Sequence, residues 1–199
     1  MVRTANMEQT EKRKLQILQG ALECFNKKGF HQSSMKEICK KAGLSPGTVY
    51  HYFKSKDDII EHIADREIEK AKELSDNLMQ VESLEKGLSY AIDDILGSNE
   101  YKEGLQVYME VVCEAGRNRK VGKKLLKAEE LVLKAVRKRL KAEKIKTDEV
   151  SHDVLSEFLG GQLELLELYK RYDPSAKKCA QMAIVCKKVV KTLLQENQG

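Results

Sequence analysis

The sequence predicts an all-α protein with a small N-terminal domain and a larger helical bundle. Its composition favours helices, because the chain has only 2 prolines, no tryptophan and 34% charged residues, in long runs rich in Lys, Glu, Leu and Ala. Within these runs apolar residues recur every three to four positions, which is the spacing of one buried helix face. At 199 residues the chain can bury a substantial core, and two domains fit this length better than one.

The first predicted helix is amphipathic and runs from about Glu8 to Lys28. Its apolar residues repeat at three-to-four-residue intervals, at Leu15, Leu18, Leu22 and Phe25, with Ile17 and Ala21 alongside. Gly29 ends the helix. One face of this helix is therefore expected to pack against the short helices that follow.

Two short helices come next, and capping residues define their ends. Ser34 and Glu37 form an S-x-x-E capping box at the start of the first, and Gly43 closes it. Ser45 as N-cap and Pro46 in the first turn begin the second. Two helices so close in sequence must turn sharply. The pattern is that of a helix-turn-helix, whose second helix can enter a major groove of DNA.

A single long helix is predicted from Lys56 to about Gln80, begun by Ser55 and Asp58 as a further cap. No Gly or Pro lies between Lys56 and Gly87, so we expect a stiff connector. Five more helices follow, with approximate spans Ser83 to Leu96, Lys102 to Ala115, Val121 to Lys141, Asp148 to Lys170 and Pro174 to Glu196.

The run from Ala42 to Lys56, AGLSPGTVYHYFKSK, resembles the DNA-binding signature of the TetR family of bacterial transcriptional regulators. The resemblance extends over about residues 10–65, and beyond it only helix number and lengths are similar. It implies a helix-turn-helix DNA-binding domain over residues 1–55. It also implies a ligand-binding and dimerisation domain over residues 56–199, in which residues 56–80 form the connecting helix.

The resemblance further implies which residues contact DNA. Tyr50 and Lys56 would bind phosphates, while the first turns of the second short helix would meet base edges. For Tyr52, packing onto the long helix is an equally good interpretation. The full predicted set is Ser34, Lys36, Pro46, Gly47, Thr48, Tyr50, His51, Tyr52 and Lys56.

The distribution of charge agrees with a DNA-binding N-terminal part. Residues 1–58 hold 11 Lys and Arg against 6 Asp and Glu, whereas the remainder holds 25 of each, so the whole net charge of +5 lies at the N-terminal end. Residues 117–146 are also basic, with 13 Lys and Arg against 3 Glu. We interpret that stretch as a solvated helix face, with contact to DNA or an acidic partner as the alternative.

The last two predicted helices are apolar on more than one side, which in a protein of this size suggests a second subunit. A pair of adjacent glycines in the first of them would let two backbones approach closely. The predicted homodimer interface comprises Leu155, Leu159, Gly160, Gly161, Leu163, Ala183, Cys186 and Val190.

Members of the TetR family usually bind a small-molecule effector inside the second domain and then release DNA. By that resemblance we expect an apolar or amphipathic effector. Its predicted site comprises Tyr90, Tyr101, Tyr108, Met109, Cys113, Phe158 and Gln162. Each of these residues, taken alone, is better explained as ordinary core.

Other classes of function find little support. The four histidines have no spacing typical of a metal site, and the chain has neither a G-x-S-x-G motif nor a phosphate-binding loop, so we expect no enzyme, metal or cofactor. Five cysteines without C-x-x-C spacing favour structural thiols. No apolar stretch could span a bilayer and the N-terminus lacks a signal-peptide core, so a cytoplasmic location is expected.

The sequence therefore predicts a ligand-responsive DNA-binding regulator, in particular a repressor that binds a palindromic operator as a homodimer. Two alternatives stay open. One is an all-helical small-molecule carrier whose helix-turn-helix is only structural. The other is a regulator controlled by a protein partner.

Overall fold

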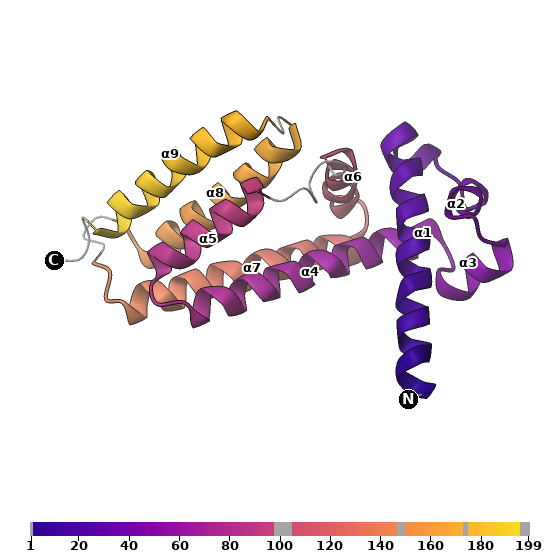
Figure 1. The fold of residues 1–199 in the computed structure, drawn as a ribbon, viewed down its shortest axis with the longest axis horizontal. Coiled ribbons are helices and arrows are strands. Elements are labelled where there is room, and N and C mark those ends of the chain that lie inside the picture. Colours follow the sequence, from indigo (N-terminus) through magenta and orange to yellow (C-terminus); the bar gives the residue numbers. More distant parts are fainter. Residues whose placement is uncertain (1, 98–104, 147–149, 173–174, 196–199) are drawn as a thin grey trace. The chain divides into compact units, whose positions relative to one another are not determined.

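The structure is a computed structural model that describes residues 2–97, 105–146, 150–172 and 175–195. Within these ranges the chain forms nine helices and no strand, which confirms the all-α prediction (Figure 1). The helices are α1 Val2–Gln32, α2 Met35–Ala42, α3 Pro46–Tyr52, α4 Lys56–Gln80, α5 Leu84–Gly97, α6 Leu105–Ala115, α7 Arg119–Ala142, α8 His152–Tyr172 and α9 Ala176–Gln195. The predicted start of the last helix, at Asp173 and Pro174, lies outside the described residues.

The chain divides into two compact units. Met1–Arg66 and Gln106–Lys123 make the first, which we call the head unit, and Glu67–Leu105 with Lys124–Gly199 make the second, which we call the bundle unit. The head unit thus contains α1 to α3, the first part of α4 and nearly all of α6. The sequence pattern gave no sign that α6 packs with the N-terminal helices, because that contact joins residues far apart in the chain.

In the head unit, α1 and α2 make the densest helix contact. Gly20 lies so close to α2 that a Cβ atom there would stand 2.7 Å from the backbone nitrogen of Ala42. The Gln16 side-chain amide donates to the Ala42 carbonyl at 2.7 Å and fixes the same crossing. Around this crossing the core consists of Ile17, Leu18, Ala21, Phe25, Ile38, Val49, Phe53, Ile59 and Ile60.

Helix α1 differs from its prediction in two respects. It begins at Val2 instead of Glu8, and its trace passes through a kink at Gly29, where φ is 82° and ψ is 163°. Gly29 therefore breaks the regular helix as predicted, because few other residues adopt this backbone conformation. Leu15, predicted on the buried face, is exposed, since the buried face is centred on Ile17 and Ala21.

In the bundle unit, α5 packs against both α8 and α9. The core of this unit combines Leu84, Leu88, Ile92 and Ile95 of α5 with residues of α7, α8 and α9. Five residues predicted at the homodimer interface lie in this core, namely Leu155, Leu159, Leu163, Ala183 and Val190. That part of the prediction is wrong, because these side chains hold the chain's own helices together.

Gly160 also belongs to the interior of the chain. A Cβ atom at this position would lie 2.7 Å from Cδ2 of Leu133 on α7. Gly160 is therefore required for the packing of α8 against α7, and the prediction that it meets a second subunit is corrected. Its neighbour Gly161 is exposed, with no atom within 4 Å of a Cβ placed there.

Candidate nucleic-acid interface

The helix-turn-helix is built by the caps that the sequence predicts. The backbone N–H of Glu37 donates to the Ser34 hydroxyl oxygen at 3.3 Å, and the Ser34 N–H donates to the Glu37 carboxylate at 2.9 Å, which confirms the capping box. Gly43 ends α2 in the left-handed conformation, with φ of 64°. Ser45 then caps α3 by accepting from the Thr48 N–H at 3.1 Å, with Pro46 in the first turn.

The outward side of this helix pair carries most of the residues predicted to contact DNA. Exposed members of the set are Ser34, Lys36, Pro46, Gly47, Tyr50 and His51, whereas Thr48, Tyr52 and Lys56 are half-buried. The Thr48 hydroxyl lies 2.8 Å from that of Ser45 and so helps to cap α3. The rings of His51 and Tyr52 meet edge to face with centroids 5.0 Å apart, so Tyr52 orients a neighbour that faces outward.

Lys56 has a structural role that the sequence did not reveal. Its ammonium donates to the carbonyl oxygens of Phe30 at 2.7 Å and His31 at 3.0 Å, and it lies 4.8 Å from the centre of the Phe30 ring. An ammonium has three N–H donors, so one is left for a phosphate. Lys56 thus joins the start of α4 to the end of α1 while retaining the capacity for one phosphate contact.

We expect Lys56→Ala to weaken binding to all DNA sequences about equally, because one phosphate contact is lost. The slope of the logarithm of the binding constant against the logarithm of the salt concentration, which we call the salt slope, should become less steep by about 1 per half-site. The same substitution removes two bonds from a charged donor, so the free energy of unfolding of the head unit should fall by about 1–3 kcal/mol. DNA titrations at several salt concentrations and thermal unfolding measure the two effects. An unchanged slope with reduced stability would restrict Lys56 to its structural role.

Glu37 links α1 to α2 as well as capping α2. The Lys28 ammonium lies 2.5 Å from its carboxylate. The bond to Lys28, followed by the two bonds from Ser34, lowers the pKa of Glu37 from 4.5 to about 2. The folded state therefore favours the carboxylate over the carboxylic acid.

This pKa shift predicts a pH dependence. Because the folded pKa lies below the unfolded one, the charge of Glu37 stabilises the fold fully above about pH 4.5 and loses its effect as the pH falls towards 2. Glu37→Gln keeps a side-chain oxygen for the capping box but lacks the charge. The variant should be less stable than the parent at pH 7 and equally stable near pH 2, as measured by denaturant unfolding. If the difference in stability between Glu37→Gln and the parent were the same at pH 7 and pH 2, the charge of Glu37 would not be its cause.

The predicted effector residues are divided between the two units. Of the described ones, Tyr108, Met109 and Cys113 lie on α6 in the head unit, whereas Tyr90, Phe158 and Gln162 lie in the bundle unit. Tyr101 lies outside the described residues. In the single chain, four of these six are exposed: Tyr90, Met109, Cys113 and Phe158.

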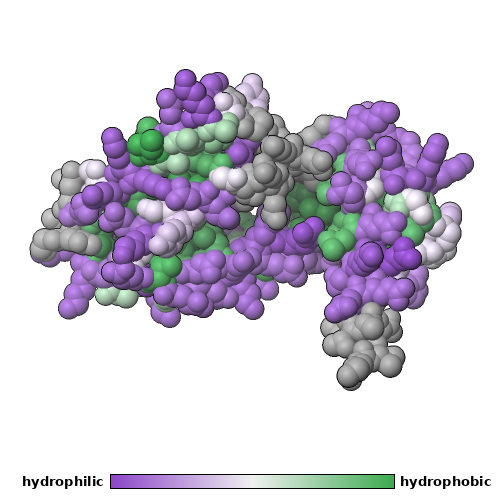
Figure 2. Space-filling model, viewed as in Figure 1, coloured by the Kyte–Doolittle hydropathy of each residue, from purple (hydrophilic) through white to green (hydrophobic). Residues whose placement is uncertain are grey.

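The bundle unit carries a second feature of interest, an exposed apolar stripe on α8. Its members recur at intervals of three, four or seven residues, so they share one helix face. They are Val154, Phe158, Gly161, Leu165 and Tyr172, and Ile184, Val185 and Val189 are exposed apolar residues on α9. Figure 2 shows apolar patches amid a mostly hydrophilic surface in the region of α5 and α9. Of the residues predicted at the homodimer interface, Gly161 is exposed on this stripe and Cys186 of α9 is half-buried.

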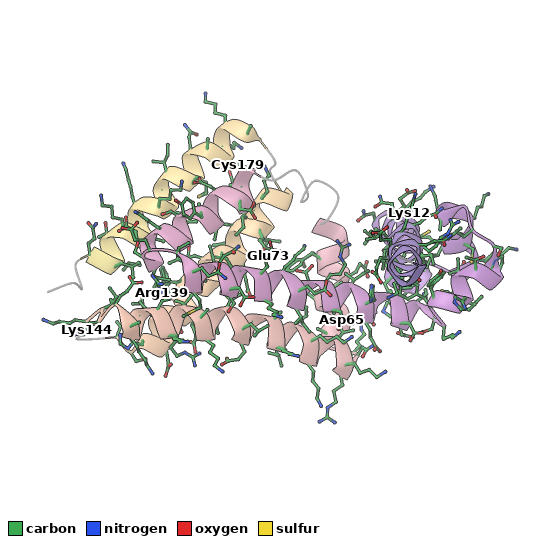
Figure 3. All side chains as sticks on the ribbon, turned by 60° about the horizontal axis from the view of Figure 1, so that its bottom comes forward. Lys12, Asp65, Glu73, Arg139, Lys144 and Cys179 are labelled. Carbon is green, nitrogen blue, oxygen red and sulfur yellow. The ribbon has the colours of Figure 1, made fainter. Side chains whose placement is uncertain are left out.

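The basic residues of α7 serve two purposes. Arg139 donates to the Val81 carbonyl at 3.0 Å and pairs with Glu143, which in turn accepts from the Leu84 N–H at 2.8 Å and so caps α5. In contrast, Lys144, two residues beyond the end of α7, is exposed and extends away from the helices (Figure 3). Further lysines of α7 are exposed, namely Lys120, Lys123, Lys127, Lys134, Lys138 and Lys141. Of these, Lys120 also forms an ion pair with Glu61 at 3.3 Å. This arrangement agrees with the interpretation of a solvated face.

Every helix within the described residues is too short or too polar to span a lipid bilayer. Over the same residues, no group of three or more His, Cys, Asp or Glu side chains could hold a metal ion.

Comparisons with known proteins agree with the geometry of the head unit. Residues 17–63 match the family of bacterial regulatory proteins described as the tetR family. The chain is 32% identical over 139 residues to the HTH-type transcriptional regulator UidR of Escherichia coli K12, covering 69% of each chain. It is 43% identical over 54 residues to the fatty acid metabolism regulator protein of Bacillus subtilis, covering 27% of this chain and 28% of the relative.

Solved structures of similar fold span almost the whole chain. Salmonella enterica GusR has a TM-score of 0.73 at 24% identity, over 92% of this chain and 96% of that one. The regulator FadR from Bacillus subtilis, in complex with stearoyl-CoA, has a TM-score of 0.67 at 19% identity, over 90% and 97%. The fold is therefore shared along both units.

Proposed function

This chain belongs to the TetR family of bacterial transcriptional regulators, and from that premise we propose that it is a repressor that binds a palindromic operator as a homodimer and releases it when a small-molecule effector binds. The observation that carries the DNA-binding part is the doubly capped helix pair, with Pro46, Gly47, Tyr50 and His51 exposed along α3. A helix of this kind, presented at a surface with net positive charge, suits the major groove. We assign DNA binding to residues 1–55, and effector binding and dimerisation to residues 56–199.

The homodimer is supported by the apolar stripe on α8. Apolar residues that line one exposed helix face are typical of helix pairing between subunits. A dimer with twofold symmetry presents two identical heads, so its operator should be palindromic. In this proposal Phe158, Gly161 and Leu165 replace the buried leucines as the centre of the interface.

An apolar or amphipathic effector is supported by two of the relatives. The match in sequence is named a fatty acid metabolism regulator of Bacillus subtilis, and the match in fold is FadR from Bacillus subtilis, solved with stearoyl-CoA. A long-chain acyl-CoA is therefore a sensible first ligand for a thermal-shift screen of this protein. If the ligand releases DNA, operator DNA must weaken ligand binding by the same factor, and titrations with and without operator measure both effects.

His51→Ala tests the DNA-binding proposal most simply. If His51 contacts a base, its removal should reduce discrimination between operator and mutated operators by about 1–3 kcal/mol while leaving affinity for random DNA unchanged. Tyr50→Phe is a matched control from the same exposed helix surface, because loss of a phosphate contact should weaken all sequences alike. Gel shifts with fragments from upstream of the protein's own gene supply the measurement. Equal loss on every sequence would remove His51 from base recognition.

A further inference from the structure

The segment Gly29–Gln32, which joins the kink of α1 to α2, is held from two sides. On one side the Lys56 ammonium binds the carbonyl oxygens of Phe30 and His31. On the other side the His31 imidazole nitrogen Nε2 lies 2.7 Å from Oε1 of Glu114, on α6. All of these groups belong to the head unit. The segment is therefore connected to the start of α4 and to the end of α6.

Glu114 is a buried carboxylate, with only 5% of its side chain exposed. A charge in such a place is strongly destabilising unless it is paired. Its partners are His31 and Arg117, whose guanidinium lies 3.2 Å from the same carboxylate oxygen and 3.2 Å from the imidazole. Because Arg117 lies in the turn after α6, His31 is the partner that ties Glu114 to the helix-turn-helix side of the head unit.

A second contact keeps α6 against the same segment. Gly29 has no side chain, and a Cβ atom there would lie 3.0 Å from Oε1 of Glu110, one turn before Glu114. The kink thus lets α6 approach closely enough for the contact between Glu114 and His31. Ser34, the N-cap of α2, follows His31 by three residues, and the Ser33 hydroxyl donates back to the Gly29 carbonyl at 2.8 Å. A displacement of His31 must therefore move the start of α2.

We propose that the Glu114 carboxylate, acting through His31, is a positioning group for the helix-turn-helix and the contact through which α6 controls DNA affinity. This inference rests on the proposed function. Neither residue needs to touch DNA. While Glu114 and His31 remain paired, the N-cap of α2 is fixed, and with it the α3 surface that enters the groove. Movement of α6 that separates the pair releases that restraint.

The test uses Glu114→Gln, His31→Ala and the double variant, with Lys120→Gln as a matched control that breaks the 3.3 Å ion pair between Lys120 and Glu61 in the same unit. Each single variant should bind operator at least about fivefold more weakly. The double variant should be no weaker than the worse single one, because both remove the same contact. The salt slope should stay unchanged, since no phosphate contact is lost. Lys120→Gln should behave as the parent.

Two further readouts separate positioning from a general loss of structure. Hydrogen exchange without DNA should be faster in residues 30–44 of Glu114→Gln and unchanged in the bundle unit. His31→Gln, which retains a side-chain N–H donor, should recover most of the affinity lost in His31→Ala. Three results would each overturn the proposal. They are additive losses of operator affinity in the double variant, a reduced salt slope in either single variant, and unaltered hydrogen exchange in residues 30–44 of Glu114→Gln. If the parent protein binds no operator, the proposed function fails, while the exchange measurement still decides whether Glu114 holds the helix pair.

Discussion

Leu165→Asp is expected to convert the proposed homodimer into a folded monomer and to lower operator affinity by roughly 100-fold or more. Leu165 lies in the apolar stripe of α8 with 56% of its surface exposed in the single chain, so the substitution leaves the core of the bundle unit intact. At an apolar interface, in contrast, an unpaired carboxylate costs several kcal/mol. A monomer binds only one half-site and loses the gain in effective concentration that links two heads.

Light scattering measures the oligomeric state of the variant, circular dichroism its folding, and titration with operator its DNA affinity. Leu126→Asp is the matched control, because Leu126 is 65% exposed on α7 and lies outside the stripe, so this variant should remain a dimer. Leu163→Asp should behave differently from both, since Leu163 is only 5% exposed and its substitution should unfold the bundle unit. A dimeric Leu165→Asp, or a parent protein that is monomeric when bound to operator, would refute the proposed interface.

Gly20→Val should abolish DNA binding by separating α1 from α2. The Cβ atom of any new side chain would lie 2.7 Å from the backbone nitrogen and 3.1 Å from the Cα of Ala42, and backbone atoms cannot move aside as a flexible side chain can. Overpacking of this kind costs about 1–3 kcal/mol. It would also pull Ala42 away from the Gln16 amide. Helices α2 and α3 would then lose the surface of α1 against which they pack.

Hydrogen exchange and gel shifts are the appropriate measurements for Gly20→Val. Protection should be lost in α2 and α3 and kept in α5, α8 and α9, because the latter pack in a different unit. Gly116→Ala is a suitable control within the head unit, since its new Cβ would meet the nearest carbonyl oxygen at an ordinary 3.6 Å. Full operator affinity in Gly20→Val would show that the close approach of α1 to α2 is not needed for DNA binding.

The features that the sequence predicted correctly are governed by local chemistry. The capping box of Ser34 and Glu37, the left-handed Gly43 and the caps at Ser45 and Pro46 each depend on residues within a few positions of one another. The end of the connecting helix at Gln80 was also predicted correctly, although no glycine lies nearby. These signals can be interpreted without knowledge of the tertiary fold.

The features that could not be predicted depend on which segments meet in space. Helix α8 has two apolar faces, one that contains Leu163 and one that contains Leu165. Periodicity alone does not tell which of the two faces packs against other helices of the same chain. The attachment of Lys56 to the carbonyl of Phe30, and the pairing of His31 with Glu114, join residues distant in sequence. No pattern of spacing contains that information.

Footprinting the protein on the region upstream of its gene shows whether two copies of this helix-turn-helix bind one operator together. We expect protection of two half-sites in inverted repeat, with centres about 34–36 Å or a multiple of that distance apart, so that both α3 helices enter major grooves on one face of the duplex. Sedimentation of the same complex should give an even number of chains per operator. Protection of a single unrepeated site by one chain, or protection independent of sequence, would contradict the proposed binding of a palindromic operator by a homodimer.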